Sequence, residues 1–144
     1  MPHRISTAAT AVCVLSIGSM LASDIPKKTF HLNEKVETEI GYAQAVRIGD
    51  TLYVSGSVGA GEMAGAIHQA YDELKKTLAA HGLDFRNVVK ENVFSTDLDA
   101  FIKNKDIRKE YYGSDYPAAT WVQVQRLYLP TFVVEIEITA VFPK

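Results

Sequence analysis

Hydrophobic and polar residues alternate along several short stretches of the chain, which is the pattern of strands with one buried face. The clearest pair is residues 43–48 and 51–55, separated by Gly49 and Asp50, and this spacing predicts a β-hairpin. Further strands are expected at residues 27–32, 88–96, 120–125 and 133–142.

A helical period replaces this alternation in residues 63–81. The apolar positions recur every three or four residues and form one stripe, made of Met63, Ile67, Ala70, Tyr71, Leu74 and Leu78. Gly82 follows at the position where a left-handed C-terminal cap is expected. A second helix is predicted to begin at Asp97 or Asp99 and to end at Tyr112, before Gly113.

Two stretches are predicted to be loops. Residues 33–39 are polar, and residues 56–61 (GSVGAG) are rich in glycine but lack the lysine of a phosphate-binding loop. The latter stretch is therefore expected to be a crossover loop. The resulting order, β-β-β-α-β-α-β-β, predicts an α+β domain with two helices on one face of a mostly antiparallel sheet.

The last predicted strand has two distinct faces. One carries the apolar side chains Val134, Ile136, Ile138, Ala140 and Phe142, and the other carries Glu135, Glu137, Thr139 and Val141. The apolar face suits a layer of helices. Two helices can cover only one side of a sheet, so we expect a partner subunit to cover part of the other.

Composition narrows the classes of function. The chain has 144 residues, 47% hydrophobic and 22% charged, which suits one globular domain, placed at residues 23–144. The net charge of −2 and the lack of any Lys/Arg run longer than two argue against DNA binding. No metal site is predicted, because His31, His68 and His81 are scattered.

Residues 1–22 differ from the rest of the chain. Arg4 precedes an apolar run, and no acidic residue occurs before Asp24, which is the pattern of a signal peptide. The protein is therefore expected to be periplasmic or secreted, without a membrane anchor after cleavage, or cytoplasmic if this segment is not a signal. Cys13 is the only cysteine, so the processed chain would contain none.

Four blocks of sequence, in order, resemble the Rid (YjgF) family. Residues 40–56 read IGYAQAVRIGDTLYVSG, similar to the family's I-G-P-Y-S-Q-A, hairpin and V-S-G-Q. Residues 87–101, NVVKENVFSTDLDAF, resemble D-V-V-K-T-T-V-F-L-x-D-M-x-D-F. Residues 117–124 (PAATWVQV) and 134–141 (VEIEITAV) resemble P-A-R-S-x-V-x-V and V-E-I-E-A-I-A-V.

This resemblance implies a chorismate-mutase-like α+β fold of the YjgF type, a homotrimer, and a small-molecule ligand bound in clefts between subunits. The activity that it implies is a deaminase reaction, in which reactive enamines or imines are hydrolysed to a ketone and ammonia. Neither a metal nor an organic cofactor is implied.

The family's site residues transfer to several positions. Glu135 matches the catalytic glutamate, Tyr42 the pocket tyrosine, and Gly56 the glycine whose N–H faces the ligand carboxylate, with Ser55 before it. The alternative interpretation of Glu135 is a solvated or interface carboxylate.

The ligand-binding block departs from the pattern at Ala119, where the family has arginine, and continues with Thr120 and Trp121. Loss of that guanidinium removes a bidentate contact worth about 2–5 kcal/mol. The pocket is expected to be more aromatic and less cationic, and to favour neutral, apolar or ring-bearing ligands. The sequence leaves open whether Arg126 or Lys90 replaces the arginine.

Three functions remain as hypotheses. The first is a divergent enamine or imine deaminase, a hydrolase with a non-typical substrate. The second is a non-catalytic ligand-binding or chaperone-like trimer of the same fold. The third is a ribonuclease, an activity often attributed to this family, which the net charge of −2 supports poorly.

Overall fold

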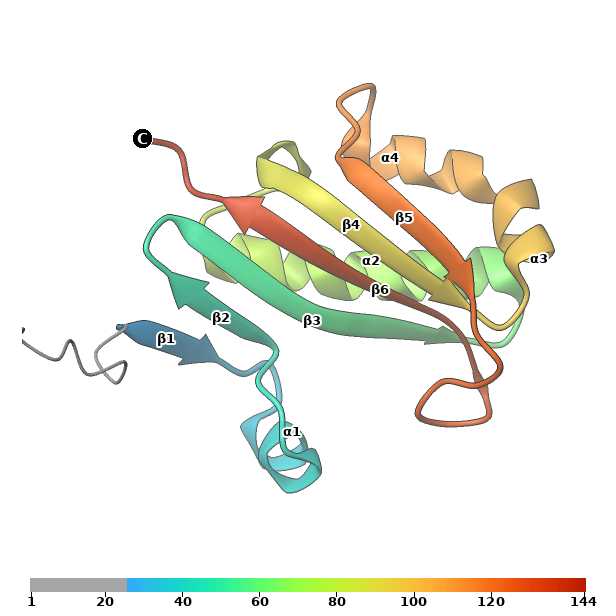
Figure 1. The fold of residues 1–144 in the computed structure, drawn as a ribbon, viewed down its shortest axis with the longest axis horizontal. Helices are drawn as coiled ribbons and strands as arrows, with labels where there is room; N and C mark the ends of the chain where they lie inside the picture. The colour runs from blue at the N-terminus through green and yellow to red at the C-terminus, as the bar shows by residue number, and fades with distance from the viewer. Residues whose placement is uncertain (1–25) are drawn as a thin grey trace, which may run out of the picture.

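The computed structural model describes residues 26–144, which form one six-stranded sheet with helices packed on one face (Figure 1). The strands are β1 (Lys27–Phe30), β2 (Ala45–Ile48), β3 (Thr51–Ala60), β4 (Val88–Ser95), β5 (Ala118–Gln123) and β6 (Phe132–Val141). Their order in the sheet is β1-β2-β3-β6-β4-β5, and only β4 and β5 pair in parallel. The predicted α+β class is confirmed.

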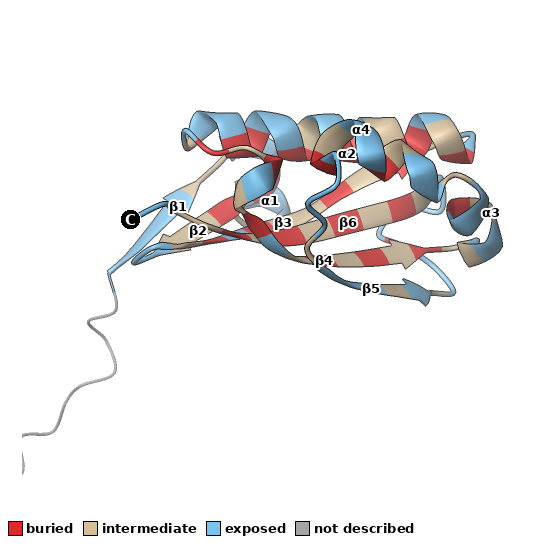
Figure 2. Cartoon of the chain, turned by 90° about the horizontal axis from the view of Figure 1, so that it is seen from above, coloured by how far each residue is buried: buried red, intermediate tan, exposed pale blue. Residues whose placement is uncertain are grey.

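The core lies between this sheet and helix α2 (Met63–Ala80). On β6, Val134, Ile136 and Ala140 are fully buried, so the apolar face predicted for this strand is confirmed. The layers are separate in Figure 2, where the helices lie above the sheet and its lower face has no helix. Within residues 26–144, the face that carries Glu135 therefore lacks a covering layer.

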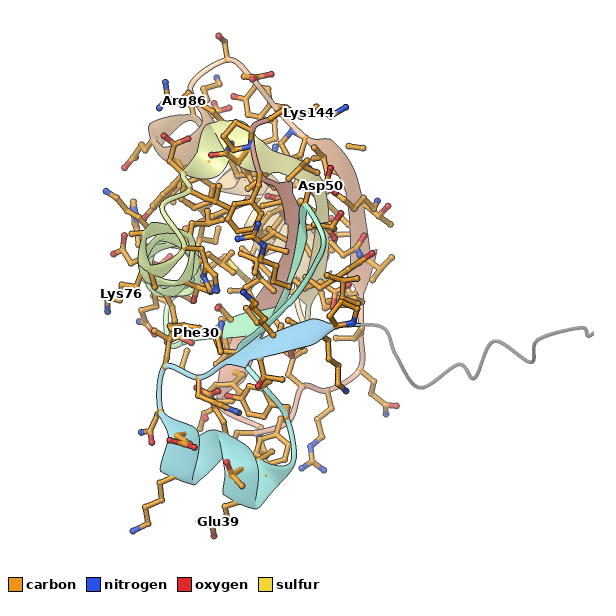
Figure 3. All side chains as sticks on the ribbon, turned by 90° about the vertical axis from the view of Figure 1, so that its left-hand side faces the viewer. Phe30, Glu39, Asp50, Lys76, Arg86 and Lys144 are labelled. Atoms are coloured by element: carbon orange, nitrogen blue, oxygen red, sulfur yellow. The ribbon has the colours of Figure 1, made fainter. Side chains whose placement is uncertain are left out.

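Helix α2 follows its sequence signals closely. The Glu62 side chain caps its first turn by accepting from the backbone N–H of Ala64 and Gly65, and Gly82 follows the helix with a φ of 69°. All six residues of the predicted stripe are buried. Lys76, by contrast, lies on the side of α2 that faces away from the sheet (Figure 3).

The loop predicted at residues 33–39 is wrong, because helix α1 (Glu34–Ile40) occupies this stretch. Asn33 caps the helix through its side chain, and Gly41 ends it with a φ of 98°. The helix has no apolar stripe from which it could be predicted. It is held instead by Glu37, which is 2% exposed and accepts hydrogen bonds from the chain on both sides of the helix.

The crossover loop predicted at residues 56–61 is also wrong, because β3 runs through to Ala60. The glycines serve close packing rather than a turn. A Cβ at Gly59 would overlap the backbone of Ala66, so its absence lets α2 pack directly on the strand. A Cβ at Gly56 would overlap the side chain of Glu135 on the other face.

The second predicted helix is divided. Asp97 caps α3 (Leu98–Lys103), a turn of 3₁₀ helix follows at Lys105–Ile107, and α4 (Arg108–Tyr112) completes the segment before Gly113. The start and stop signals were therefore predicted correctly, but the continuous helix between them was not.

The predicted signal peptide and Cys13 lie outside the described residues. Among residues 26–144, no helix combines the length and the apolar character needed to cross a bilayer.

Candidate functional site

Glu135 lies on the uncovered face of the sheet, in the first half of β6. Its neighbours across the sheet are Val58 on β3 and Phe94 on β4. A bulge in β3 between Val54 and Ser57 leaves Ser55 and Gly56 without a partner on β6. The Glu135 side chain occupies the space above Gly56 that any larger residue would fill.

The environment of Glu135 favours proton transfer. Burial raises the pKa of its carboxyl group, and the nearby Glu137 carboxylate raises it further. The two carboxylates are held differently. Glu137 accepts a hydrogen bond of 2.7 Å from the Asn92 amide, whereas Glu135 has no hydrogen-bond partner within residues 26–144. A half-buried carboxyl with a raised pKa and no fixed partner is suited to act as a general acid and base.

Tyr42 and Ser55 lie at the same end of the sheet. The Ser55 hydroxyl donates to the Ala43 carbonyl at 2.7 Å, which ties the bulge to the chain beside Tyr42. Burial raises the pKa of the Tyr42 hydroxyl, and the charges of Glu37, Glu73 and Glu135 add to this. One chain therefore brings Tyr42, Ser55, Gly56 and Glu135 to one region of the sheet.

Two surface depressions border Glu135 and Glu137. The larger, about 610 Å³, is lined by Phe94, Val124, Arg126, Leu127, Tyr128, Glu135 and Glu137. Arg126 is the only cation lining this depression, and its guanidinium donates to the Tyr128 carbonyl at 3.3 Å. Lys90 lines the neighbouring depression of about 250 Å³ and donates to the Thr120 hydroxyl at 2.7 Å.

The remaining predicted ligand residues lie elsewhere. In the β4–β5 pairing, Ala119 stands opposite Glu91 and Trp121 opposite Val93, both of which are buried on the helix-bearing face. Thr120 instead shares the uncovered face with Lys90. Within a single chain, Ala119 and Trp121 are thus separated from Glu135 by the sheet.

Two residues beside Ala119 were missed by the sequence reasoning. Glu91 is fully buried on the helix-bearing face of β4, and Arg108, at the start of α4, lies with its Nη2 at 2.8 Å from Glu91 Oε1. The available signal was a glutamate at a core-facing position of an alternating strand, since such a charge needs a buried partner. Nothing in the sequence alone identified Arg108 as that partner.

No group of three or more His, Cys, Asp or Glu side chains in the described part of the chain is arranged to hold a metal ion. The groups available on the uncovered face are Glu135, its neighbouring carboxylate, the adjacent hydroxyls and the cations Lys90 and Arg126.

The fold and this site define a small α+β protein with a half-buried carboxylate on an uncovered sheet face. A family model described as "Endoribonuclease L-PSP" matches residues 33–142. The chain belongs to this family, the Rid (YjgF) family, as its sequence blocks suggested.

Several similar proteins are named 2-iminobutanoate/2-iminopropanoate deaminase. The chain is 37% identical to the mouse 2-iminobutanoate/2-iminopropanoate deaminase over 117 residues, which cover 74% of this chain and 86% of that protein. It is 36% identical to the human protein of the same name over 95 residues, covering 60% of this chain and 69% of that protein.

Solved structures agree on the fold. A YjgF/YER057c/UK114 family member from Mycobacterium tuberculosis superposes with a TM-score of 0.74 at 26% identity, covering 81% of this chain and 99% of that one. A putative endoribonuclease from Thermotoga maritima gives a TM-score of 0.71 at 31% identity, with the same coverage.

Proposed function

We propose that this protein hydrolyses imines or enamines to a carbonyl compound and ammonia, with Glu135 as the acid–base residue. The observation that carries this proposal is the Glu135 carboxyl, half-buried above Gly56, with a raised pKa and no fixed hydrogen-bond partner in the described residues. The names of the mouse and human relatives support the same reaction.

The chemistry requires one group that both donates and accepts a proton. Protonated Glu135 donates to the imine nitrogen, or to the β-carbon of an enamine, and the resulting iminium carbon becomes electrophilic. The Glu135 carboxylate then accepts a proton from the water that attacks this carbon. Glu135 then donates this proton to the carbinolamine nitrogen and accepts the hydroxyl proton as the C–N bond breaks, so that C=NH and H₂O give C=O and NH₃ and Glu135 is again protonated. The raised pKa of Glu135 favours the protonated form that the first step requires.

The substrate is proposed to bind between copies of the chain in a homotrimer. The support is twofold: the Glu135 face has no covering layer within residues 26–144, and Ala119 and Trp121 lie across the sheet from Glu135 in the same chain. A neighbouring copy can supply the Ala119–Trp121 strand to the Glu135 face. We further propose a substrate bulkier than 2-iminobutanoate, because a methyl group and an indole stand where the family pattern has an arginine and a variable residue.

The reaction is tested with a pyridoxal-phosphate dehydratase that generates imines in situ from amino acids of increasing size, while ammonia release is followed. The protein should accelerate release, and Glu135→Gln should slow it by a factor on the order of 10²–10⁴. Glu39→Gln is the matched control, because Glu39 is exposed on α1.

A wild-type protein that leaves ammonia release at the uncatalysed rate for every imine contradicts the proposal. That outcome would favour the non-catalytic ligand-binding trimer of the same fold.

A further inference from the structure

Arg108 is a buried cation with most of its hydrogen-bonding capacity unused. Its side chain is 8% exposed, and its Nε donates to Glu91 Oε1 at 3.0 Å and to the Tyr71 hydroxyl at 3.2 Å. Nη2 is buried near Glu91 but has no aligned acceptor, and Nη1 makes no hydrogen bond within residues 26–144. Buried guanidinium N–H groups are costly to leave without acceptors, so this arrangement lacks a partner.

Glu91 does not need those N–H groups. The Tyr71 and Tyr112 hydroxyls donate to Glu91 Oε2 at 2.7 and 2.8 Å. The Trp121 indole N–H donates to Oε1 at 3.3 Å, in addition to Arg108 Nε. The carboxylate therefore orients the arginine. Although burial alone would lower it, Glu91 and Tyr71 hold the pKa of Arg108 above its usual value.

Aromatic rings surround the guanidinium. Its central carbon lies 4.9 Å from the ring centre of Trp121, 5.1 Å from Tyr116 and 5.4 Å from Tyr112. Tyr116 is 43% exposed and the methyl of Ala119 is also exposed, so this side of the group borders the surface. A cation with rings on several sides binds a carboxylate that carries an apolar or cyclic substituent.

Ala119 and Glu91 depart from the family blocks together. Where the closing signature has arginine this chain has Ala119, and where the V-V-K-T-T-V-F block has its first threonine it has Glu91. The two residues are opposite one another in the β4–β5 pairing. A guanidinium is thus lost from β5, and the carboxylate that holds another is present on the adjacent strand.

We propose that Arg108 binds the substrate carboxylate in this protein, in the role that the family pattern gives to an arginine at position 119. This inference rests on the proposed function for the identity of the substrate, an imine or enamine that bears a carboxylate and an apolar or ring group. Nη1 makes no hydrogen bond within residues 26–144, whereas Nη2 lies against Glu91, so Nη1 is the end of the guanidinium that donates to the substrate carboxylate.

The first test measures binding without turnover. Calorimetry with cyclohexanecarboxylate and with its neutral amide, cyclohexanecarboxamide, separates charge from shape. The carboxylate should bind at least tenfold more tightly and should change the emission of Trp121, which is the only tryptophan in the chain and lies against Arg108. Equal affinities for acid and amide, or no binding of the acid, would overturn the proposal.

Variants then assign the binding to Arg108. Arg108→Gln should abolish the preference for the acid, whereas Arg126→Gln, at the cation that shares a depression with Glu135, should retain it. Arg108→Gln leaves Glu91 buried without its cation and can fail to fold, so Glu91→Gln provides an independent measurement. This variant keeps the guanidinium and removes the competing charge, and should bind the acid severalfold more tightly. An unchanged affinity in Glu91→Gln, or loss of the preference in Arg126→Gln instead, contradicts the assignment.

The two proposals can fail separately. Acid-selective binding without ammonia release in the dehydratase assay would refute the hydrolase and retain the Arg108 site. Ammonia release with no preference for the acid over the amide would do the reverse.

Discussion

At the scale of single residues, the candidate site depends on a glycine, Gly56, whose lack of a side chain makes room for Glu135. Glu135 occupies its position because Gly56, which lies in the bulge of β3, has no Cβ. A carboxylate pressed against backbone in this way is partly desolvated, and this burial is the first cause of its raised pKa. The absence of a Cβ at Gly56 is therefore a condition for the raised pKa of Glu135.

Gly56→Ala tests this link. The new methyl group would overlap the Glu135 side chain, which must rotate away. We expect imine hydrolysis to fall at least tenfold and the free energy of unfolding to fall by about 1–3 kcal/mol. Gly65→Ala is the matched control, because Gly65 lies in α2 where an added methyl group would have no atom within 4 Å. It should retain activity and gain roughly 0.5–1 kcal/mol. Full activity in Gly56→Ala would show that the position of Glu135 is not critical.

The sequence predicted some of these residues and not others, for a physical reason. Alternation along residues 133–142 was enough to place Glu135 and Glu137 on the face opposite the core. The role of Arg108 depends on where α4 packs against the sheet, and no local sequence pattern predicts that position. The sequence showed that Ala119 stands where the family pattern has an arginine. It could not show that Arg108, eleven positions earlier in the chain, packs near this part of β5.

At the scale of elements, α1 illustrates how a short polar helix forms. Its seven residues have neither an apolar stripe nor the length for independent stability. Glu37 supplies what the sequence pattern lacks, by accepting from the His31 ring and from the backbone N–H groups of Leu32, Asn33 and Gln44. These contacts join β1, α1 and the start of β2, so the helix exists because of its surroundings. A prediction from residues 33–39 alone could not include them.

The stability that the Glu37 tether provides, meaning its hydrogen bonds to His31, Leu32, Asn33 and Gln44, should depend on pH in a defined direction. Burial alone would raise the pKa of Glu37, but the N–H of Asn33, the His31 ring and the N–H groups of Gln44 and Leu32 hold it below its usual value. A lowered folded-state pKa gives stability that is present above the unfolded value of about 4.3 and lost as the pH falls through the folded value.

Glu37→Gln should therefore lower the free energy of unfolding by about 1.5–3 kcal/mol at pH 7, measured by urea denaturation. The difference from wild type should shrink below about pH 4. Glu39→Gln, on the exposed side of the same helix, should change stability by less than about 0.5 kcal/mol at either pH. A difference for Glu37→Gln that is as large at pH 3 as at pH 7 would rule out the carboxylate as the tether.

At the scale of the whole molecule, one face of the sheet is covered by helices and the other is uncovered within residues 26–144. The helices bury the apolar side of the sheet, while the other side carries Glu135, Glu137, Lys90 and Asn92 together with the 52% exposed ring of Tyr53. Two surface depressions border these groups. An uncovered sheet face with apolar residues between hydrogen-bonded polar pairs is suited to pack against another copy of itself.

Assembly on this face gives the last prediction. Light scattering of the purified protein at micromolar concentration should give three times the mass of one chain. Tyr53→Arg, which places a charge among the polar pairs of the uncovered face, should shift the protein towards smaller species. Ile102→Arg is the matched control, because Ile102 is a similarly exposed apolar residue, 41% exposed on α3, away from that face. If the Glu135 site is completed by a neighbouring copy, imine hydrolysis should fall in proportion to the loss of trimer in Tyr53→Arg and remain unchanged in Ile102→Arg. A fully active monomer would contradict both the trimer and the shared site, because Ala119 and Trp121 cannot reach Glu135 across the sheet of their own chain.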